Sequence, residues 1–374
     1  MSQPIIIKSV YELMDWLKNE KIEYQIVGET AMGHPIVMVH KEGVGQPVII
    51  TAGAHASEPA GVSAALELLK NWDYPFPLYM FPLRDPFGCQ GYAGCLSQIL
   101  GQEVEFKTCE ELNELLLKHA DKVYNNDGKF TIVLIKDVLF TNLRFVPGEA
   151  GPRQSEICTN EFLQAHPEFI AEFEGKRIVC PANFTDDAET VRQYERAFTA
   201  EITSNGTFAD MNRRFGGESE PPEVKIVREK VDEIKPYVAL DLHEGFGSTY
   251  YYFVTDYTTN ERLRHYVDLM IDACKDDFPS GPWRLQGVVA SIPEAEHQYI
   301  EPVPGVLQDI RGKYSEGTHK GLTGTGFSGY CSRYCPSVTL ESGTDNTMKA
   351  RVRMHVKCAT AVLEDVAKTN KQGN

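Results

Sequence analysis

Three features that often define a class of protein are missing from this sequence. No run approaches the roughly 18 apolar residues that a helix needs to span a bilayer. The short apolar patch near the N-terminus lacks the small-residue cleavage site of a secretory signal. No cluster of lysine or arginine offsets the formal net charge of -16, which repels phosphate backbones and anionic lipid. We therefore expect neither a nucleic acid nor a membrane as a partner.

A disulfide framework is also missing. The nine cysteines are odd in number and are scattered through apolar stretches. Cys331 and Cys335 could bind a metal, but this spacing without a second pair is more typical of two buried thiols. We therefore expect reduced cysteines and a cytoplasmic location.

The composition, with 42% hydrophobic and 24% charged residues, is that of an ordinary globular protein with a sizeable core. Three continuous apolar runs, at residues 47–53, 237–243 and 336–343, predict strands that are buried on both faces. Helical patterns occupy residues 59–72 and 348–368. Strands that alternate with helices predict an α/β fold with a mostly parallel sheet covered on both sides.

Residues from about 95 to 200 have a different character and suggest an insertion. A capping box at Thr108 and Glu111 predicts the start of an acidic helix that runs to Tyr124. A short apolar run, FTIVLI, predicts a strand. The Gly- and Pro-rich stretch FVPGEAGPRQ predicts a surface loop.

The carboxyl ends of the three predicted strands carry residues that can bind a metal, and α/β sheets bind ligands at this edge. His55 and Glu58 are three residues apart at a strand-to-helix turn, and His243 ends the second strand. Two histidines and a carboxylate suit a tetrahedral zinc ion with one open position. Glu341, in the third strand, remains to take a proton from an attacking water. Each motif is weak alone, because HxxE often occurs by chance and a histidine at a strand end is usually just hydrogen-bonded.

A fourth segment, FADMNRRFGG at 208–217, strengthens this interpretation. It places Asp210, Asn212 and Arg213 in one short turn. A guanidinium beside an amide binds carboxylates well, and an aspartate can orient a zinc-bound imidazole. Without the other motifs, an ordinary surface turn would be the better explanation.

Taken in chain order, these segments resemble the M14 family of zinc carboxypeptidases, which is related to the succinylglutamate desuccinylase and aspartoacylase group. The matching segments are VGETAMGHPI, the HxxE motif, MFPLRDPFG, DMNRRF, DLHEG and TLESG, over about 320 residues. Asp85 and Phe87 depart from the family pattern, which usually has NPDG at this place.

The resemblance implies a single catalytic domain over residues 1–374, with a central mixed, largely parallel eight-stranded sheet flanked by helices. It implies Zn2+ as cofactor, bound by three residues that we call the metal set and name at the end of this paragraph. It also implies Glu341 and Arg213 as catalytic residues. It further implies that Asn212 and Arg213 bind the terminal carboxylate of the substrate and that Asp210 supports the first histidine. The metal set is His55, Glu58 and His243.

Two family residues have no clear match. The arginine that polarises the scissile carbonyl could be Arg84, Arg144 or Arg153, of which we rank the last two slightly higher. The mobile tyrosine that binds substrate could be Tyr314 or Tyr330, and we favour Tyr330. The insertion lengthens the gap between the second and third zinc ligands, so the substrate specificity of the family cannot be transferred.

Three functions follow, in order of preference. The first is zinc-dependent cleavage of a C-terminal peptide or peptide-like amide bond, by glutamate-assisted attack of a zinc-activated water on a substrate with a free carboxylate. The second is deacylation of N-acyl amino acids, and the third is a catalytically silent binding protein. The third is least favoured, because all three ligands and the base are present. The sequence predicts neither side-chain specificity nor oligomeric state.

Overall fold

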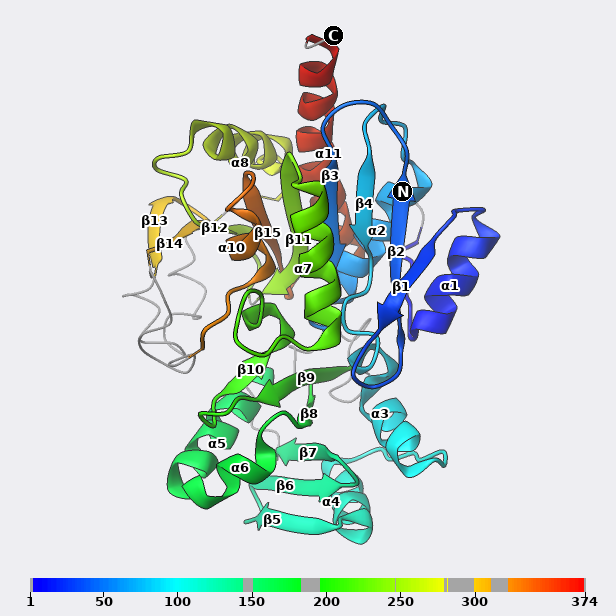
Figure 1. The fold of residues 1–374 in the computed structure, drawn as a ribbon, viewed down its shortest axis with the longest axis vertical. Helices are drawn as coiled ribbons and strands as arrows, with labels where there is room; N and C mark the ends of the chain where they lie inside the picture. The colour runs from blue at the N-terminus through cyan, green and yellow to red at the C-terminus, as the bar shows by residue number, and fades with distance from the viewer. Residues whose placement is uncertain are drawn as a thin grey trace.

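The computed structural model of the chain shows two sheets joined in one molecule (Figure 1). The residues that it describes are 3–143, 151–182, 196–245, 247–278, 281, 299–310 and 322–372. Within these residues one sheet has nine strands and the other has six. The smaller sheet lies at the end of the molecule away from the C-terminus (Figure 1).

The nine-stranded sheet is mixed, with a parallel centre. From edge to edge its strands are β1 (Gln25–Glu29), β2 (Pro35–Lys41), β4 (Leu78–Phe81), β3 (Val48–Ala52), β11 (Val238–Gly245), β15 (Ser337–Gly343), β12 (Tyr251–Val254), β14 (Val306–Asp309) and β13 (Tyr299–Val303). The centre of the sheet consists of four strands that all run in the same direction, in the order β4, β3, β11 and β15. The central strands therefore share one carboxyl edge, where a ligand site is expected.

The predicted fold class is confirmed, with two differences in the sheet. β3, β11 and β15, which match the three apolar runs, are buried along their whole lengths. The described sheet has nine strands instead of eight, and the hairpin of β14 and β13 lengthens one edge. Its turn contains Pro304 and Gly305, and Gly305 has a φ of 82°, which suits a tight Pro-Gly turn. The hairpin makes an antiparallel pair, as short connections do, and within the described sheet only the centre and the β12–β14 pair are parallel.

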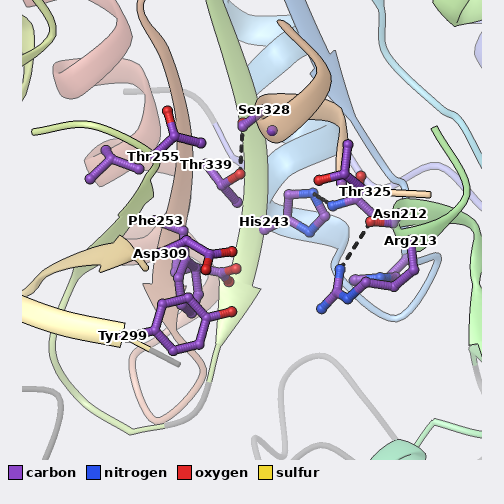
Figure 2. Close-up of a pocket in the computed structure, with 15 residues that line it drawn as sticks. Asn212, Arg213, His243, Phe253, Thr255, Tyr299, Asp309, Thr325, Ser328 and Thr339 are labelled. Carbon is purple, nitrogen blue, oxygen red and sulfur yellow. Dashed lines mark hydrogen bonds between the residues drawn. The ribbon is translucent and has the colours of Figure 1, made fainter. Parts of the chain in front are cut away.

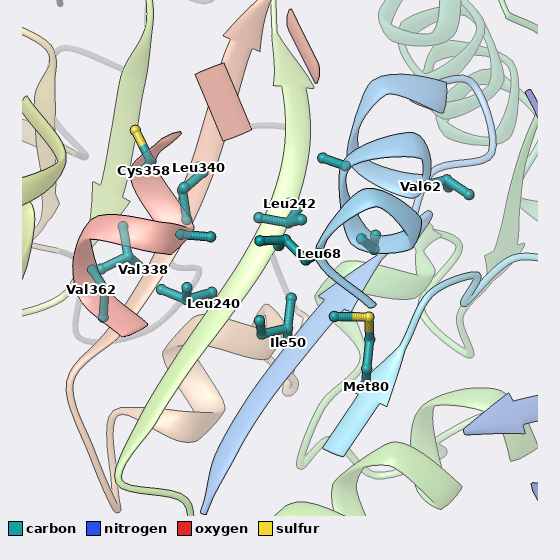
Figure 3. Packing of buried hydrophobic residues seen from close by; sticks show 14 of the residues in the cluster. Ile50, Val62, Leu68, Met80, Leu240, Leu242, Val338, Leu340, Cys358 and Val362 are labelled. Carbon is teal, nitrogen blue, oxygen red and sulfur yellow. The ribbon is translucent and has the colours of Figure 1, made fainter. Parts of the chain in front are cut away.

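The two faces of this sheet are covered by different helices. One face packs against α1 (Val10–Asn19), α2 (Pro59–Lys70), α8 (Glu261–Cys274) and α11 (Met348–Gln372), and the other against α7 (Pro222–Ile234) and α10 (Phe327–Cys331). Leu240 and Leu242 of β11 point toward α2 and α11 in the larger core (Figure 3). Because side chains alternate along a strand, Asp241 and His243 point to the other face.

The six-stranded sheet occupies most of the predicted insertion and extends beyond it. Its order is β10 (Phe208–Asp210), β9 (Ala197–Ile202), β8 (Arg177–Pro181), β7 (Val138–Leu143), β6 (Phe130–Ile135) and β5 (Lys122–Asn126). The accompanying helices are η1 (Gly88–Gln90), α3 (Gly91–Leu100), α4 (Cys109–His119), α5 (Gly151–Ala165), η2 (Pro167–Phe169) and α6 (Ile170–Phe173). The last strand, β10, leads directly into η3 (Met211–Arg213), so this sheet delivers the DMNRRF segment to the centre of the molecule.

Some local predictions in this region are confirmed and others are wrong. Thr108 caps α4 by accepting a hydrogen bond from the backbone of Glu111 at 3.1 Å, and FTIVLI forms β6. The helix ends at His119, however, and Tyr124 lies in β5, because the strand pairs with β6 and this pairing overrides the helical pattern. In the FVPGEAGPRQ stretch, residues 145–150 lie outside the described residues, and residues 151–154 begin α5 instead of continuing a loop.

A buried network of charges fastens the second sheet to the central one. Arg177 of β8 forms ion pairs with Glu223, at the start of α7, and with Glu201 of β9 at 3.3 Å. Arg214, just after η3, pairs with the same Glu201 at 3.1 Å. These contacts hold β9 and the turn after β10 against the central sheet.

No helix in the described part of the chain is both long enough and apolar enough to span a membrane.

Candidate metal centre

The first two candidate ligands come from the turn between β3 and α2. Gly53 follows the strand with a φ of 61°, a left-handed conformation that favours glycine. The helix begins at Pro59, and Glu58 is its N-cap residue. This geometry brings Nδ1 of His55 to 2.7 Å from Oε1 of Glu58.

The third candidate ligand, His243, comes from β11, which pairs with β3. Its Nδ1 lies 2.8 Å from Oε2 of Glu58, and the imidazole rings of His55 and His243 are 5.0 Å apart at their centres. Each of the three residues offers one ligand atom, and these atoms all lie within 4.8 Å of one another. The structure therefore brings together the three residues that the sequence singled out for a metal.

The donor atoms fit a cation. Oε2 of Glu58 is buried and has no hydrogen bond within the described residues, although Nδ1 of His243 is close to it. Glu58 therefore presents Oε1 to Nδ1 of His55 and Oε2 to Nδ1 of His243, so that the three candidate donors face one another. Two imidazoles and a carboxylate are a typical zinc donor set.

The charges at the site point the same way. Burial alone lowers the pKa of His55, but the charges of Glu58 and Asp210 raise it to about 9. Burial also opposes the charged form of His243, yet Asp241 and Glu58 hold its pKa well above the usual value. Without a metal, the pocket therefore gathers positive charge on its histidines, and a divalent cation can replace these protons.

A carboxylate lies behind each histidine. Nε2 of His55 is 3.2 Å from Oδ1 of Asp210, as the resemblance implies. Nε2 of His243 is 2.8 Å from Oδ2 of Asp241, a residue that the sequence analysis missed. Each carboxylate favours the tautomer with the proton on Nε2, which leaves Nδ1 free to bind a metal. Asp241 could have been found from its position two residues before His243, on the same face of the strand.

The expected base, Glu341, lies beside the metal ligands. It is directly paired with His243 across the parallel strands β15 and β11, so both side chains leave the sheet on one face. Burial raises the pKa of Glu341 to about 8, although the positive charge of His243 opposes the shift. A carboxylate with a pKa near neutrality is well suited to accept and return a proton.

Arg213 and Asn212 both line the cavity, but their side chains differ in exposure and in contacts. The Arg213 side chain is 28% exposed, and its Nη1 donates to the backbone oxygen of Asn212 at 3.0 Å. Oδ1 of Asn212 accepts from Nη2 of Arg84 at 3.2 Å and from the backbone N–H of Phe327 at 3.0 Å. Its Nδ2 then faces Asp241 at 3.4 Å. This buried amide is part of the framework, an arrangement that does not support the expected contact of its side chain with a substrate carboxylate.

The structure does not place Tyr330 in the cavity. Its hydroxyl donates to Oδ1 of Asp232 at 2.7 Å, and it is not among the residues that line the pocket. The helix α10 turns it toward α7 and away from the metal ligands. The structure therefore gives no support to Tyr330 as a substrate-binding residue, and Tyr299 is the tyrosine among the described pocket residues. Tyr314, the other candidate, lies outside the described residues.

The candidates for the carbonyl-polarising arginine also change. Arg84 is buried and pairs with Asp241 at 3.2 Å, so it cannot reach a substrate. Arg144 lies outside the described residues, and the side chain of Arg153 does as well, although its backbone belongs to α5. This role is therefore open.

The cavity beside the ligands has a volume of about 110 Å³. In Figure 2, Arg213 and Asn212 lie on one side of His243, and Phe253, Asp309 and Tyr299 lie on the other. The lining residues are His55, Asn212, Arg213, His243, Phe253, Val254, Thr255, Tyr299, Asp309, Thr325, Gly326, Ser328, Gly329, Thr339 and Glu341. Most of those that the sequence analysis missed are small, namely the threonines, the serine and the glycines, and they lie in or next to β12, α10 and β15.

No protein-family model matches the chain, and no curated protein matches it. Among solved structures, it is similar to a metallo-carboxypeptidase from Burkholderia cenocepacia, with 13% identity, 96% of this chain and 69% of that chain covered, and a TM-score of 0.47. It is also similar to bovine thrombin-activatable fibrinolysis inhibitor in complex with tick carboxypeptidase inhibitor, with 12% identity, 98% of both chains covered and a TM-score of 0.47. At these values the likeness is distant and does not assign the chain to a family.

Proposed function

We propose that this chain is a zinc-dependent metallocarboxypeptidase that cleaves a C-terminal peptide or peptide-like amide bond. One observation carries the proposal: the metal set, the buried Glu341 and the half-exposed Arg213 meet in and around a single cavity. These groups come from four segments that are far apart in the chain, so their meeting is unlike a chance motif. The cavity supplies what hydrolysis of a substrate with a free carboxylate needs.

Zinc fits the donor set of His55, Glu58 and His243, and it supplies Lewis acidity that polarises a carbonyl and acidifies water. Glu341 takes a proton from the attacking water while the oxygen of that water bonds to the scissile carbonyl carbon. The same carboxyl group then gives that proton to the departing amine nitrogen as the carbon–nitrogen bond breaks. Its pKa, raised by burial, favours both transfers.

Arg213 fits the role of binding the terminal carboxylate of the substrate. Its guanidinium is the positive side chain among the described residues that line the cavity, apart from the two histidines. A guanidinium can bind a carboxylate through two parallel hydrogen bonds. A substrate held in this way would place its last amide bond between the metal set and Glu341.

The same proposal covers the whole chain as one catalytic domain, with the second sheet as an insertion. Asp210 ends the last strand of that sheet, and Asn212 and Arg213 follow it in η3, so the catalytic groups depend on both sheets. The nine cysteines are free thiols in the structure. Because disulfides are rare in cytosolic proteins, these free thiols support the proposal of a cytoplasmic location.

The test uses the purified protein with zinc, and Glu341→Gln with Glu114→Gln as a matched control on the exposed surface of α4. We expect all three proteins to hold one zinc per chain by metal analysis. Glu341→Gln should lose nearly all hydrolysis of short peptides with a free C-terminus, whereas the control keeps it. Retained hydrolysis in Glu341→Gln would reject the role of this residue.

Two other results would change the assignment. Faster hydrolysis of N-acyl amino acids than of short peptides by the wild-type protein would make it a deacylase, the alternative function. Less than one metal per chain in every preparation, without hydrolysis of either substrate, would indicate a silent binding protein.

A further inference from the structure

Arg84 lies at the centre of the buried contacts behind the metal ligands. Its side chain is 3% exposed. Nη1 donates to both carboxylate oxygens of Asp241, at 3.2 and 3.3 Å. Nη2 donates to Oδ1 of Asn212 at 3.2 Å. One guanidinium thus holds two different side chains.

The first of these contacts leads to the metal. Asp241 is fully buried, and its Oδ2 is 2.8 Å from Nε2 of the ligand His243. The hydroxyl of Thr51 donates to Oδ1 of the same carboxylate at 2.5 Å. A buried carboxylate needs such partners to remain charged and fixed in place. Arg84 therefore helps to keep this carboxylate against the imidazole.

The second contact leads to the carboxylate-binding side of the cavity. Asn212 lies in η3, between Asp210, which contacts His55, and Arg213. Its Oδ1 accepts only from the framework, from Arg84 and from the start of α10. Moving this amide would move the turn that carries the partly exposed guanidinium of Arg213.

We propose that Arg84 is a positioning residue that couples the metal centre to η3, the turn whose Arg213 would bind the substrate carboxylate. One arm holds Asp241 against His243, and the other holds Asn212 and with it the position of Arg213. The second arm rests on the whole proposed function, whereas the first rests only on its metal site.

Lysine cannot replace this arrangement. The guanidinium is planar and offers donors in two fixed directions, whereas an ammonium group is a compact charge on a flexible stem. The Arg84 group also lies near two aromatic rings, 4.9 Å from the centre of Phe215 and 5.4 Å from that of Phe327. Both rings are within the range of a cation–π contact with the guanidinium, which limits its movement.

The experiment compares Arg84→Met, which keeps the apolar stem but loses both arms, with Arg84→Lys, which can keep the ion pair with Asp241. Zinc affinity is measured by competition with a chromophoric chelator. Peptide affinity is measured in a Glu341→Gln background, where nothing is cleaved. Arg196→Met is the matched control, because Arg196 is a buried arginine whose hydrogen bonds within the described residues go to Cys89 and to no metal ligand.

We expect Arg84→Met to weaken zinc binding about 10- to 100-fold, the usual effect of losing a partner behind a ligand. Arg84→Lys should keep its zinc affinity within about threefold of wild type. Its affinity for a peptide with a free C-terminus should fall about tenfold, which is the effect of one misplaced charged contact. The same peptide with an amidated C-terminus should bind equally to Arg84→Lys and to wild type. The conservative lysine variant thus separates the two arms.

Three outcomes would overturn the proposal. The first is zinc affinity of Arg84→Met equal to that of wild type, with circular dichroism showing a folded protein. The second is an equal loss of zinc affinity in Arg196→Met, which would indicate a general loss of structure. The third is a loss of peptide affinity in Arg84→Lys that is equally large for the free and for the amidated C-terminus. If no peptide binds even to the Glu341→Gln protein, the proposed function fails, while the zinc titrations still decide the first arm.

Discussion

His243 and Glu341 are direct neighbours across the parallel strands β11 and β15. Strands in a sheet lie about 4.8 Å apart, so the separation of the third candidate ligand and the proposed base is set by backbone hydrogen bonds. Such positions are held more rigidly than positions on loops. The pairing places a proton acceptor beside the metal set without a separate structural element.

The length of the Glu341 side chain should matter as much as its charge. Glu341→Asp keeps the carboxylate but withdraws it by one methylene group from the cavity beside His55 and His243. We expect kcat to fall about 100-fold, since a positioned acid–base group typically contributes about 10²- to 10⁴-fold. KM and zinc content should change little. Steady-state kinetics with metal analysis test this, and an unchanged kcat would show that the proton moves elsewhere.

Metal binding should release protons and strengthen as the pH rises. The neighbouring carboxylates raise the pKa of His55 to about 9 in the metal-free protein, so below that pH a cation must displace a proton from this residue. The apparent zinc affinity should therefore increase with pH, by up to about tenfold per unit for each proton released, and level off above the raised pKa. Calorimetry at neutral pH in two buffers of different ionisation enthalpy measures the protons. Equal heats in both buffers would contradict this prediction.

Asp241 and Arg84 should be strongly coupled in stability. Asp241→Asn leaves a buried guanidinium without its ion pair, and breaking a buried pair in this way costs about 3 to 5 kcal/mol. In the double variant with Arg84→Met, the second change should restore part of the loss, because no charge is left without a partner. Urea unfolding of the two single variants and the double variant gives the coupling. Additive losses would show that the two side chains act independently.

Gly61 should not tolerate even alanine. Replacing a glycine inside a helix normally stabilises a protein by about 0.5–1 kcal/mol. Here a Cβ atom would lie 2.4 Å from the backbone oxygen of Leu242, which cannot move without shifting β11. We expect Gly61→Ala to lower the free energy of unfolding by about 1–3 kcal/mol and to weaken zinc binding, because α2 begins just after Glu58. A stabilised variant would show that the helix can shift freely.

The sequence alone was enough for the main elements and for the metal set. The runs that form β3, β11 and β15 are apolar along their whole length, and this local signal depends little on context. Parallel strands share a carboxyl edge, so ligands placed after them could be expected to meet. The convergence of His55, Glu58 and His243 followed from that rule.

Local patterns did not predict which partners the polar side chains would find. Tyr330 bonds to Asp232, Arg84 to Asp241, and Asn212 to Arg84, and each of these pairs is separated by many residues. The second sheet was mostly missed as well, because short strands such as β8 and β9 become stable only when they pair. Only the tertiary structure decided these features, since burial forces each polar group to find a partner and the fold determines which groups are near.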